Sequence, residues 1–134
     1  IRNTPSFVFK NYYLSANDDL IYRPFVQAYF INCIMDGNAE TEFVCDTIGT
    51  DIGFSVNATF NYCSIKTEDT ISSNAIFNNC FRNLNTNFKN VEEWNFELTD
   101  SSEIIDLGTN SLVTTDLLER SRAIPNDLGC YEFQ

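Results

Sequence analysis

The chain has 134 residues and a formal net charge of −11, so nucleic-acid phosphates and anionic lipid would repel it and no nucleic-acid partner is expected. Hydrophobic residues make up 43% of it and aromatic residues 14%, which excludes a disordered tail and suits one domain with its own core. No run of 18 apolar residues occurs, so no integral membrane segment is expected. The many Asn, Asp, Thr and Ser residues favour strands and tight turns over helices.

A short pattern recurs four times, near residues 5–14, 26–35, 56–65 and 73–82. In each copy a Phe is followed by a variable residue, then by Asn or Tyr, then by Cys or Tyr; the four Phe are Phe9, Phe30, Phe60 and Phe77. A unit that cannot bury its apolar face alone is typical of stacked repeats. We therefore predict an all-β solenoid of about four coils over residues 1–82.

The apolar columns suggest how each repeat is bent. Those before and after the Asn column are out of phase, so the alternation of a strand is broken between them. Asn tolerates the left-handed backbone conformation better than other non-Gly residues, which predicts a strand, an Asn corner and a second strand. Stacking would align parallel strands and let corner Asn amides hydrogen-bond along the stack. The alternative is a sandwich of antiparallel strands that share a Phe by chance.

The chain begins at Ile1 without a Met or a charged and apolar leader, so either a signal segment has been removed or the chain is a piece of a longer protein. The first repeat starts almost at once, with no capping segment to cover the open strand edges. We therefore expect further coils upstream and a longer natural chain.

The longest spacing between repeats contains an acidic excursion, residues 36–53, with three glycines. Its carboxylates include Asp36, Asp46 and Asp51, which are candidate ligands for calcium or a sugar. They lack the alternating spacing of a calcium-binding loop. An acidic, solvated loop that keeps the protein soluble is the simpler interpretation, and no metal or cofactor is assigned.

Three of the five cysteines, Cys33, Cys63 and Cys80, occupy one repeat column and would stack inside the core as free thiols. The alternatives are a metal site or a disulfide. The chain has no His and no zinc-type spacing, and stacked neighbours rarely have disulfide geometry.

Residues 83–134 depart from the repeat pattern and are predicted to fold back over the last coil as a C-terminal cap. Within them, Trp94 stands beside an alternating strand that contains Phe96, and Thr115 with Asp116 can begin one helical turn. Trp94 is a candidate for stacking on a sugar ring; the alternative is a contact between the cap and the core.

One set of tail residues follows a recognisable order: Asn95, Phe96, Leu98, Ser102, Ile105, Asp106, Gly108, Asp116, Arg122 and Asp127 through to Glu132. Through these residues the tail resembles the C-terminal region of secreted right-handed parallel β-helix proteins of Gram-negative bacteria, which have a pectin-lyase-like fold. In that family N-x-F-x-L leads to S-P-A-I-D-x-G, then to D-x-x-G-x-x-R, and ends in D-I-G-A-Y-E. Glu103 stands where Pro is usual, and Glu119 stands roughly where a Gly turn would be.

The resemblance implies a right-handed parallel β-helix at the cell surface or outside the cell, with glycan contact as a property of the class. Catalysis is not expected, because the chain has no His for an activated nucleophile and no Asp pair in its strand columns. We expect a non-catalytic C-terminal module that closes the solenoid and presents loops. One alternative is a carbohydrate-binding module with a groove lined by Tyr12, Tyr13, Tyr22 and Tyr29. Another is the end of a polysaccharide lyase or hydrolase whose active site lies on upstream coils.

Overall fold

The computed structural model describes residues 4–49, 57–71 and 76–134, and there the chain is all-β apart from one 3₁₀ turn, as predicted. The repeat region contains β1 (Phe7–Lys10), β2 (Tyr12–Leu14), β3 (Leu20–Tyr22), β4 (Ala28–Ile31), β5 (Ile34–Met35), β6 (Phe43–Asp46), β7 (Ala58–Asn61), β8 (Ser64–Ile65), β9 (Phe77–Asn78) and β10 (Phe81–Arg82). The tail contains β11 (Phe88–Asn90), the 3₁₀ turn η2 (Val91–Glu93) and β12 (Asn95–Leu98). No helix among these residues is long and apolar enough to cross a membrane.

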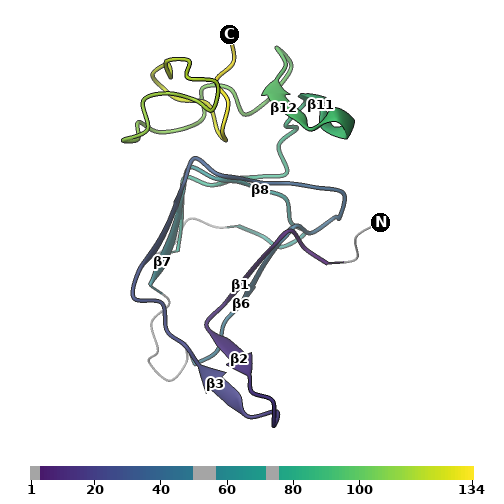
Figure 1. Cartoon of the computed structure of the whole chain (residues 1–134), viewed down its shortest axis with the longest axis vertical. Coiled ribbons are helices and arrows are strands. Elements are labelled where there is room, and N and C mark those ends of the chain that lie inside the picture. Colours follow the sequence, from purple (N-terminus) through teal and green to yellow (C-terminus); the bar gives the residue numbers. More distant parts are fainter. Residues whose placement is uncertain (1–3, 50–56, 72–75) are drawn as a thin grey trace.

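The second, third and fourth repeats pair in parallel and in register. Strands β4, β7 and β9 form one sheet, in which Phe30 aligns with Phe60 and Phe60 with Phe77. Strands β5, β8 and β10 form a second sheet, and β1 pairs with β6 in a third. Figure 1 shows these three ladders as walls around a common interior.

The predicted corners are present in these three repeats. Asn32, Tyr62 and Asn79 have left-handed φ values of 54°, 52° and 49°, and each separates two short strands. The predicted ladder of corner amides is wrong at Asn32, because its side chain bonds the backbone of Thr109 in the tail instead.

The first repeat does not join this stack, which corrects the prediction that all four copies align. Its strand β1 pairs with β6, so that Phe7 lies opposite Phe43 and Phe9 opposite Cys45. The residues after Asn11 then enter an antiparallel hairpin, β2–β3, in place of a corner and a second stacked strand. Strand β2 pairs with β3 across a short local turn, and this antiparallel pairing takes the place of parallel stacking on another repeat.

The described part of the acidic excursion, residues 36–49, is also more ordered than predicted, because it contains strand β6. Phe43 is buried and stacks on Phe7 with 5.6 Å between ring centroids. Glu42 is fully buried, and its carboxylate accepts hydrogen bonds from the backbone amides of Ser6 (2.7 Å) and Ala39 (2.8 Å). The described part of the segment is therefore folded against the repeats, since a solvated loop would leave Glu42 and Phe43 in water.

The Phe columns form the main core. Phe60 is fully buried and stacks between Phe30 and Phe77, at centroid distances of 4.5 and 5.4 Å. Phe9 and Phe43 pack edge-on against it from the β1–β6 wall. Burying one such side chain contributes about 1.5–3 kcal/mol.

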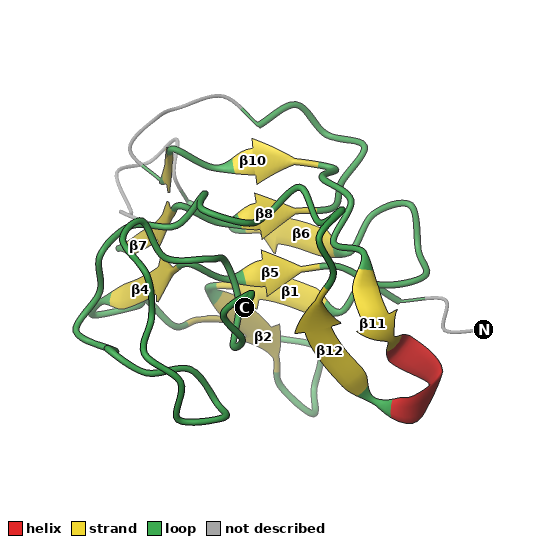
Figure 2. Ribbon diagram, turned by 90° about the horizontal axis from the view of Figure 1, so that it is seen from above, coloured by secondary structure: helices red, strands yellow, loops and turns green. Residues whose placement is uncertain are grey.

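The tail lies across the outer face of the β5–β8–β10 sheet, whereas the sequence predicted a cap over the last coil. Its buried residues Leu98, Ile104 and Leu128 pack with Ile34 and Phe81, which come from two different layers of that sheet. Figures 1 and 2 show the tail running over these strands. The β5–β8–β10 sheet carries apolar side chains on its outer face as well as on its inner face, and the tail packs against the outer ones.

Candidate functional site

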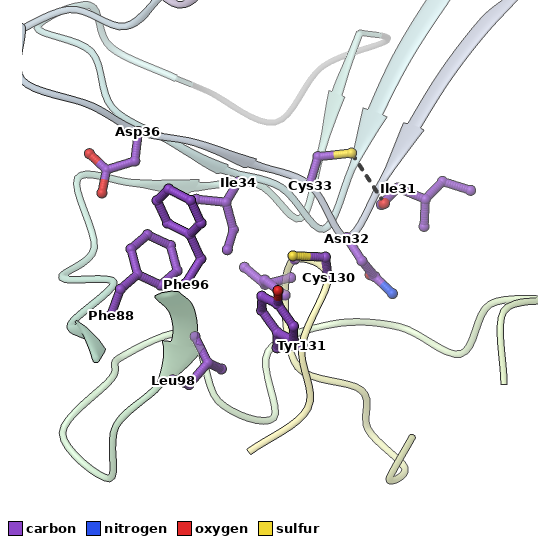
Figure 3. A pocket seen from close by; sticks show the side chains of 12 residues that line it. Ile31, Asn32, Cys33, Ile34, Asp36, Phe88, Phe96, Leu98, Cys130 and Tyr131 are labelled. Carbon is purple, nitrogen blue, oxygen red and sulfur yellow. Dashed lines mark hydrogen bonds between the residues drawn. The ribbon is translucent and has the colours of Figure 1, made fainter. Parts of the chain in front are cut away.

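A cavity of about 510 Å³ lies where the tail meets the second repeat. It is bounded by the corner between β4 and β5, by the β11–β12 hairpin and by the C-terminal segment (Figure 3). The lining residues are Ile31, Asn32, Cys33, Ile34, Asp36, Phe88, Phe96, Leu98, Leu128, Gly129, Cys130 and Tyr131.

The corner residue Asn32 fixes the tail against the repeat. Its side-chain amide donates to the carbonyl oxygen of Thr109 (2.7 Å) and accepts from the backbone amide of the same residue (2.9 Å). Its own carbonyl oxygen accepts from the backbone amide of Gly129 at 2.7 Å. The left-handed corner therefore turns three hydrogen-bonding groups toward the tail.

Gly129 fits this position because it has no Cβ. Its φ is +86°, and a Cβ built there would lie 2.5 Å from Cδ1 of Ile34. The close approach brings the C-terminal segment against the first layer of the β5–β8–β10 sheet, which forms one wall of the cavity.

The opposite wall is aromatic. Phe88 of β11 and Phe96 of β12 meet edge to face at 5.4 Å. Trp94 lies in the hairpin turn, 6.4 Å from Phe96, and 81% of its surface is exposed. A ligand that enters this side of the cavity would meet a broad aromatic surface.

The one carboxylate in the lining, Asp36, is already engaged by protein groups. Its Oδ2 accepts from Thr86 Oγ1 at 2.8 Å, and its Oδ1 accepts from the Gly37 backbone amide and lies 3.5 Å from Lys66 Nζ. The cavity therefore suits a ligand with apolar faces and few polar groups better than a highly charged one.

Two of the predicted ligand residues meet on the outer surface of the β1–β6 wall. The hydroxyl of Tyr12 donates to Asp46 at 2.7 Å, and Lys10 lies 2.8 Å from the same carboxylate. A hydrogen bond from Lys10 and a second from Tyr12 lower the pKa of Asp46. The Lys10 ammonium lies 5.1 Å from the centroid of the Tyr12 ring, where it competes with sugar stacking.

The other predicted residues are dispersed. The ring of Tyr13 lies next to Arg23 in the β2–β3 hairpin, and Asp36 and Trp94 belong to the cavity region. Asp51 lies outside the described residues. The described candidates Tyr12, Tyr13, Asp36, Asp46 and Trp94 therefore do not form one site. The sequence singled out Phe96 and the 127–132 motif as marks of a family, but gave no signal that they would line a cavity.

The buried acidic residues of the tail hold its loops together. Asp127 accepts from the backbone amides of Asp106 (2.7 Å) and Phe133 (2.6 Å), and Glu132 accepts from Ala123 (2.7 Å). Arg122 completes this cluster with a contact of 3.2 Å to Glu132. These carboxylates accept hydrogen bonds from backbone amides in loops that have no strand partner, which indicates a structural role.

Comparisons of the chain with protein-family models, with curated proteins and with solved structures gave no match. Within the described ranges, no group of three or more His, Cys, Asp or Glu side chains is placed to hold a metal ion.

Proposed function

We propose that this chain is a right-handed parallel β-helix of the pectin-lyase-like kind, and that it serves as a non-catalytic module of a secreted or cell-surface protein. The observation that carries the proposal is the in-register stacking of three repeats in two parallel sheets. The chain passes through β4, β5 and β6 and then returns with β7 beside β4 and β8 beside β5. This path supports the proposal, because it is the one expected when one coil of a β-helix lies on the next.

The resemblance of the tail supports the same assignment. The glycines and acidic residues of its motif have clear structural uses here, since Gly108 and Gly129 make close contacts and Asp127 and Glu132 bond the backbone. The proposed source is a Gram-negative bacterium, and the proposed location is the cell exterior or the outer-membrane surface. The resemblance to a C-terminal region supports the further proposal that the module ends a longer coil.

The proposed role of the tail is to cover one wall of the helix and to present a site for glycan contact. The aromatic hairpin beside the 510 Å³ cavity favours this over an inert covering, because sugar rings stack on exposed aromatic faces. Neutral polysaccharides suit the chain best, since its net charge of −11 repels acidic ones.

The test is a titration of the purified chain with plant, mucin and bacterial polysaccharides, following Trp94 fluorescence and the release of reducing ends. We expect saturable binding to a neutral glycan without cleavage. Trp94→Ala should abolish the binding, while Val26→Ala, a control at another exposed position, should leave it unchanged. Because Trp94→Ala removes the fluorescent reporter, binding to the variants is measured by calorimetry. Cleavage, or silence across the whole panel, would contradict the proposed role.

A further inference from the structure

Cys33, Cys63 and Cys80 form a column of thiols through the stack. Each stands directly after a left-handed corner, and the strands that begin at the next residue, β5, β8 and β10, pair in register. The three cysteines therefore occupy equivalent positions in successive layers, with Cys63 in the middle. All three are free thiols.

The sulfur atoms share one orientation. The Sγ atoms of Cys33, Cys63 and Cys80 lie 3.3, 3.5 and 3.6 Å from the carbonyl oxygen two residues earlier in the same repeat. Those of Cys63 and Cys80 also reach a carbonyl of the preceding layer, from Phe30 (3.5 Å) and Phe60 (3.3 Å). The Cys63 and Cys80 thiols are thus directed along the stack, each toward the layer that holds the preceding cysteine of the column.

The layer spacing decides which pairs are within bonding reach. Neighbouring strands lie about 4.8 Å apart, and the Cα atoms of a disulfide are usually about 4.4–6.8 Å apart. By Cα spacing, Cys63 is therefore within disulfide reach of either neighbour. In-register Cβ atoms lie about one strand spacing apart, which is farther than the roughly 3.8 Å of a relaxed disulfide, so the bond requires a small local shift of the two layers. Cys33 and Cys80 are two layers apart, at roughly twice that spacing, and cannot bond to each other.

The two outer thiols are accessible and the middle one is not. Cys33 and Cys80 are half-buried, Cys33 lines the cavity of Figure 3, and Cys63 is fully buried. Hydrogen bonding by the Cys63 thiol lowers the pKa of Cys33 and of Cys80 to about 7, and the same contacts raise the pKa of Cys63. The outer thiols are thus the more ionised and the more nucleophilic near neutral pH.

We propose that this thiol column is a redox site, in which the buried Cys63 forms a disulfide with either neighbour. The oxidant is a small hydroperoxide. The Cys33 thiolate attacks one peroxide oxygen, so that an S–O bond forms, the O–O bond breaks, and the departing alkoxide or hydroxide takes up a proton. Cys63 then attacks the Cys33 sulfur, the S–S bond forms, the S–O bond breaks, and the released hydroxide leaves as water with the Cys63 proton.

The column also allows the disulfide to move without further oxidation. When Cys80 attacks the Cys63 sulfur of the first disulfide, a new S–S bond forms and Cys33 leaves as a thiolate. Thiol–disulfide exchange favours attacking, central and leaving sulfurs in one line, and the stacked layers provide that arrangement. Oxidation at one end of the column is thereby passed to the other.

The experiment is oxidation of the folded chain with hydrogen peroxide, followed by non-reducing digestion and mass spectrometry. We expect Cys33–Cys63 and Cys63–Cys80 linkages. Cys33→Ala should leave only the second linkage and Cys80→Ala only the first. Cys63→Ala should lose both and accumulate sulfenic acid that dimedone traps. The matched controls Cys45→Ala and Cys130→Ala, at exposed cysteines, should keep the wild-type pattern.

Circular dichroism verifies that each variant is folded, and the half-buried positions 33 and 80 test the proposal without a change at the buried Cys63. Linkages that join Cys45 or Cys130 in place of Cys63 would overturn it. So would thiols that remain reduced under excess peroxide, or equal dimedone trapping in the wild type and in Cys63→Ala.

Discussion

The backbone amide of Gly129 donates a 2.7 Å hydrogen bond to the carbonyl oxygen of Asn32, and this contact ties the C-terminal segment to the first stacked corner. The two residues are far apart in sequence but meet because the corner is left-handed and Gly129 has no side chain. The contact closes one side of the candidate site and depends on backbone geometry at both ends.

Gly129→Ala should therefore destabilise the protein. An L-residue in the left-handed region costs about 1–2 kcal/mol, and the new Cβ would also collide with Cδ1 of Ile34. We expect a loss of about 2 kcal/mol or more in the free energy of unfolding, measured by urea denaturation. Ile34→Val removes the colliding methyl group, so the double variant should lose less than the sum of the two single changes. Strict additivity would contradict this account.

Phe60→Ala should be the most damaging single change in the aromatic core. Phe60 is fully buried between two stacked rings, and large-to-small core substitutions of Phe cost about 3–5 kcal/mol. Phe133→Ala is the matched control, because 37% of that side chain is exposed near the chain end. Urea midpoints that fall equally in the two variants would show that Phe60 is not in the core.

Asn79 offers a clean test of the left-handed corners, since it is exposed and has a φ of 49°. Asn79→Ala should cost about 1 kcal/mol, because Ala tolerates this region less well than Asn. Asn79→Gly should be close to neutral, because Gly adopts the conformation without strain. Thermal unfolding of both variants distinguishes these effects. Equal stability of the Ala and Gly variants would argue against a left-handed corner.

Asp116 should make the tail sensitive to acid. Burial of its carboxyl opposes ionisation, but hydrogen bonds from Arg120 and from backbone amides outweigh that effect and lower its pKa to about 2. An Asp in an unfolded chain has a pKa of about 3.9. The stabilisation is thus fully present above about pH 4 and is lost as the pH falls through the folded value of about 2.

The expected result is that Asp116→Asn is less stable than the wild type near pH 7, and that this difference shrinks as the pH approaches 2. Denaturant titrations at several pH values measure it. Asp100→Asn, at an exposed position, is the control and should show little difference at any pH. A gap that stays constant down to pH 2 would contradict the assigned ionisation.

The stacking of the later repeats could be predicted from the sequence, because Phe30, Phe60 and Phe77 mark equivalent positions and the corner column favours Asn. The fate of the first repeat could not be predicted in the same way. The pattern of its Tyr12–Leu14 segment fits any short strand, parallel or antiparallel. In the structure this segment pairs with the nearby Leu20–Tyr22 strand and forms a hairpin.

The cavity could not be predicted from the sequence either, for a different reason. Its walls come from a corner, a hairpin and the chain end, and only tertiary packing places Phe96 opposite Cys33 and Gly129. The surface candidates Tyr12 and Asp46 do meet, but they hydrogen-bond to each other, so their polar groups are less available to a ligand. Residue type alone does not tell a satisfied polar group from an available one.

The most direct test of the account is a set of cross-strand nuclear Overhauser contacts between backbone protons of the repeats. Parallel stacking predicts contacts around Phe30 and Phe60, with every partner 30 residues further along, and around Phe60 and Phe77, with every partner 17 residues further along. An antiparallel sandwich would give contacts in which one residue number rises as the other falls. The first pattern would support the stacked module, and the second would contradict it.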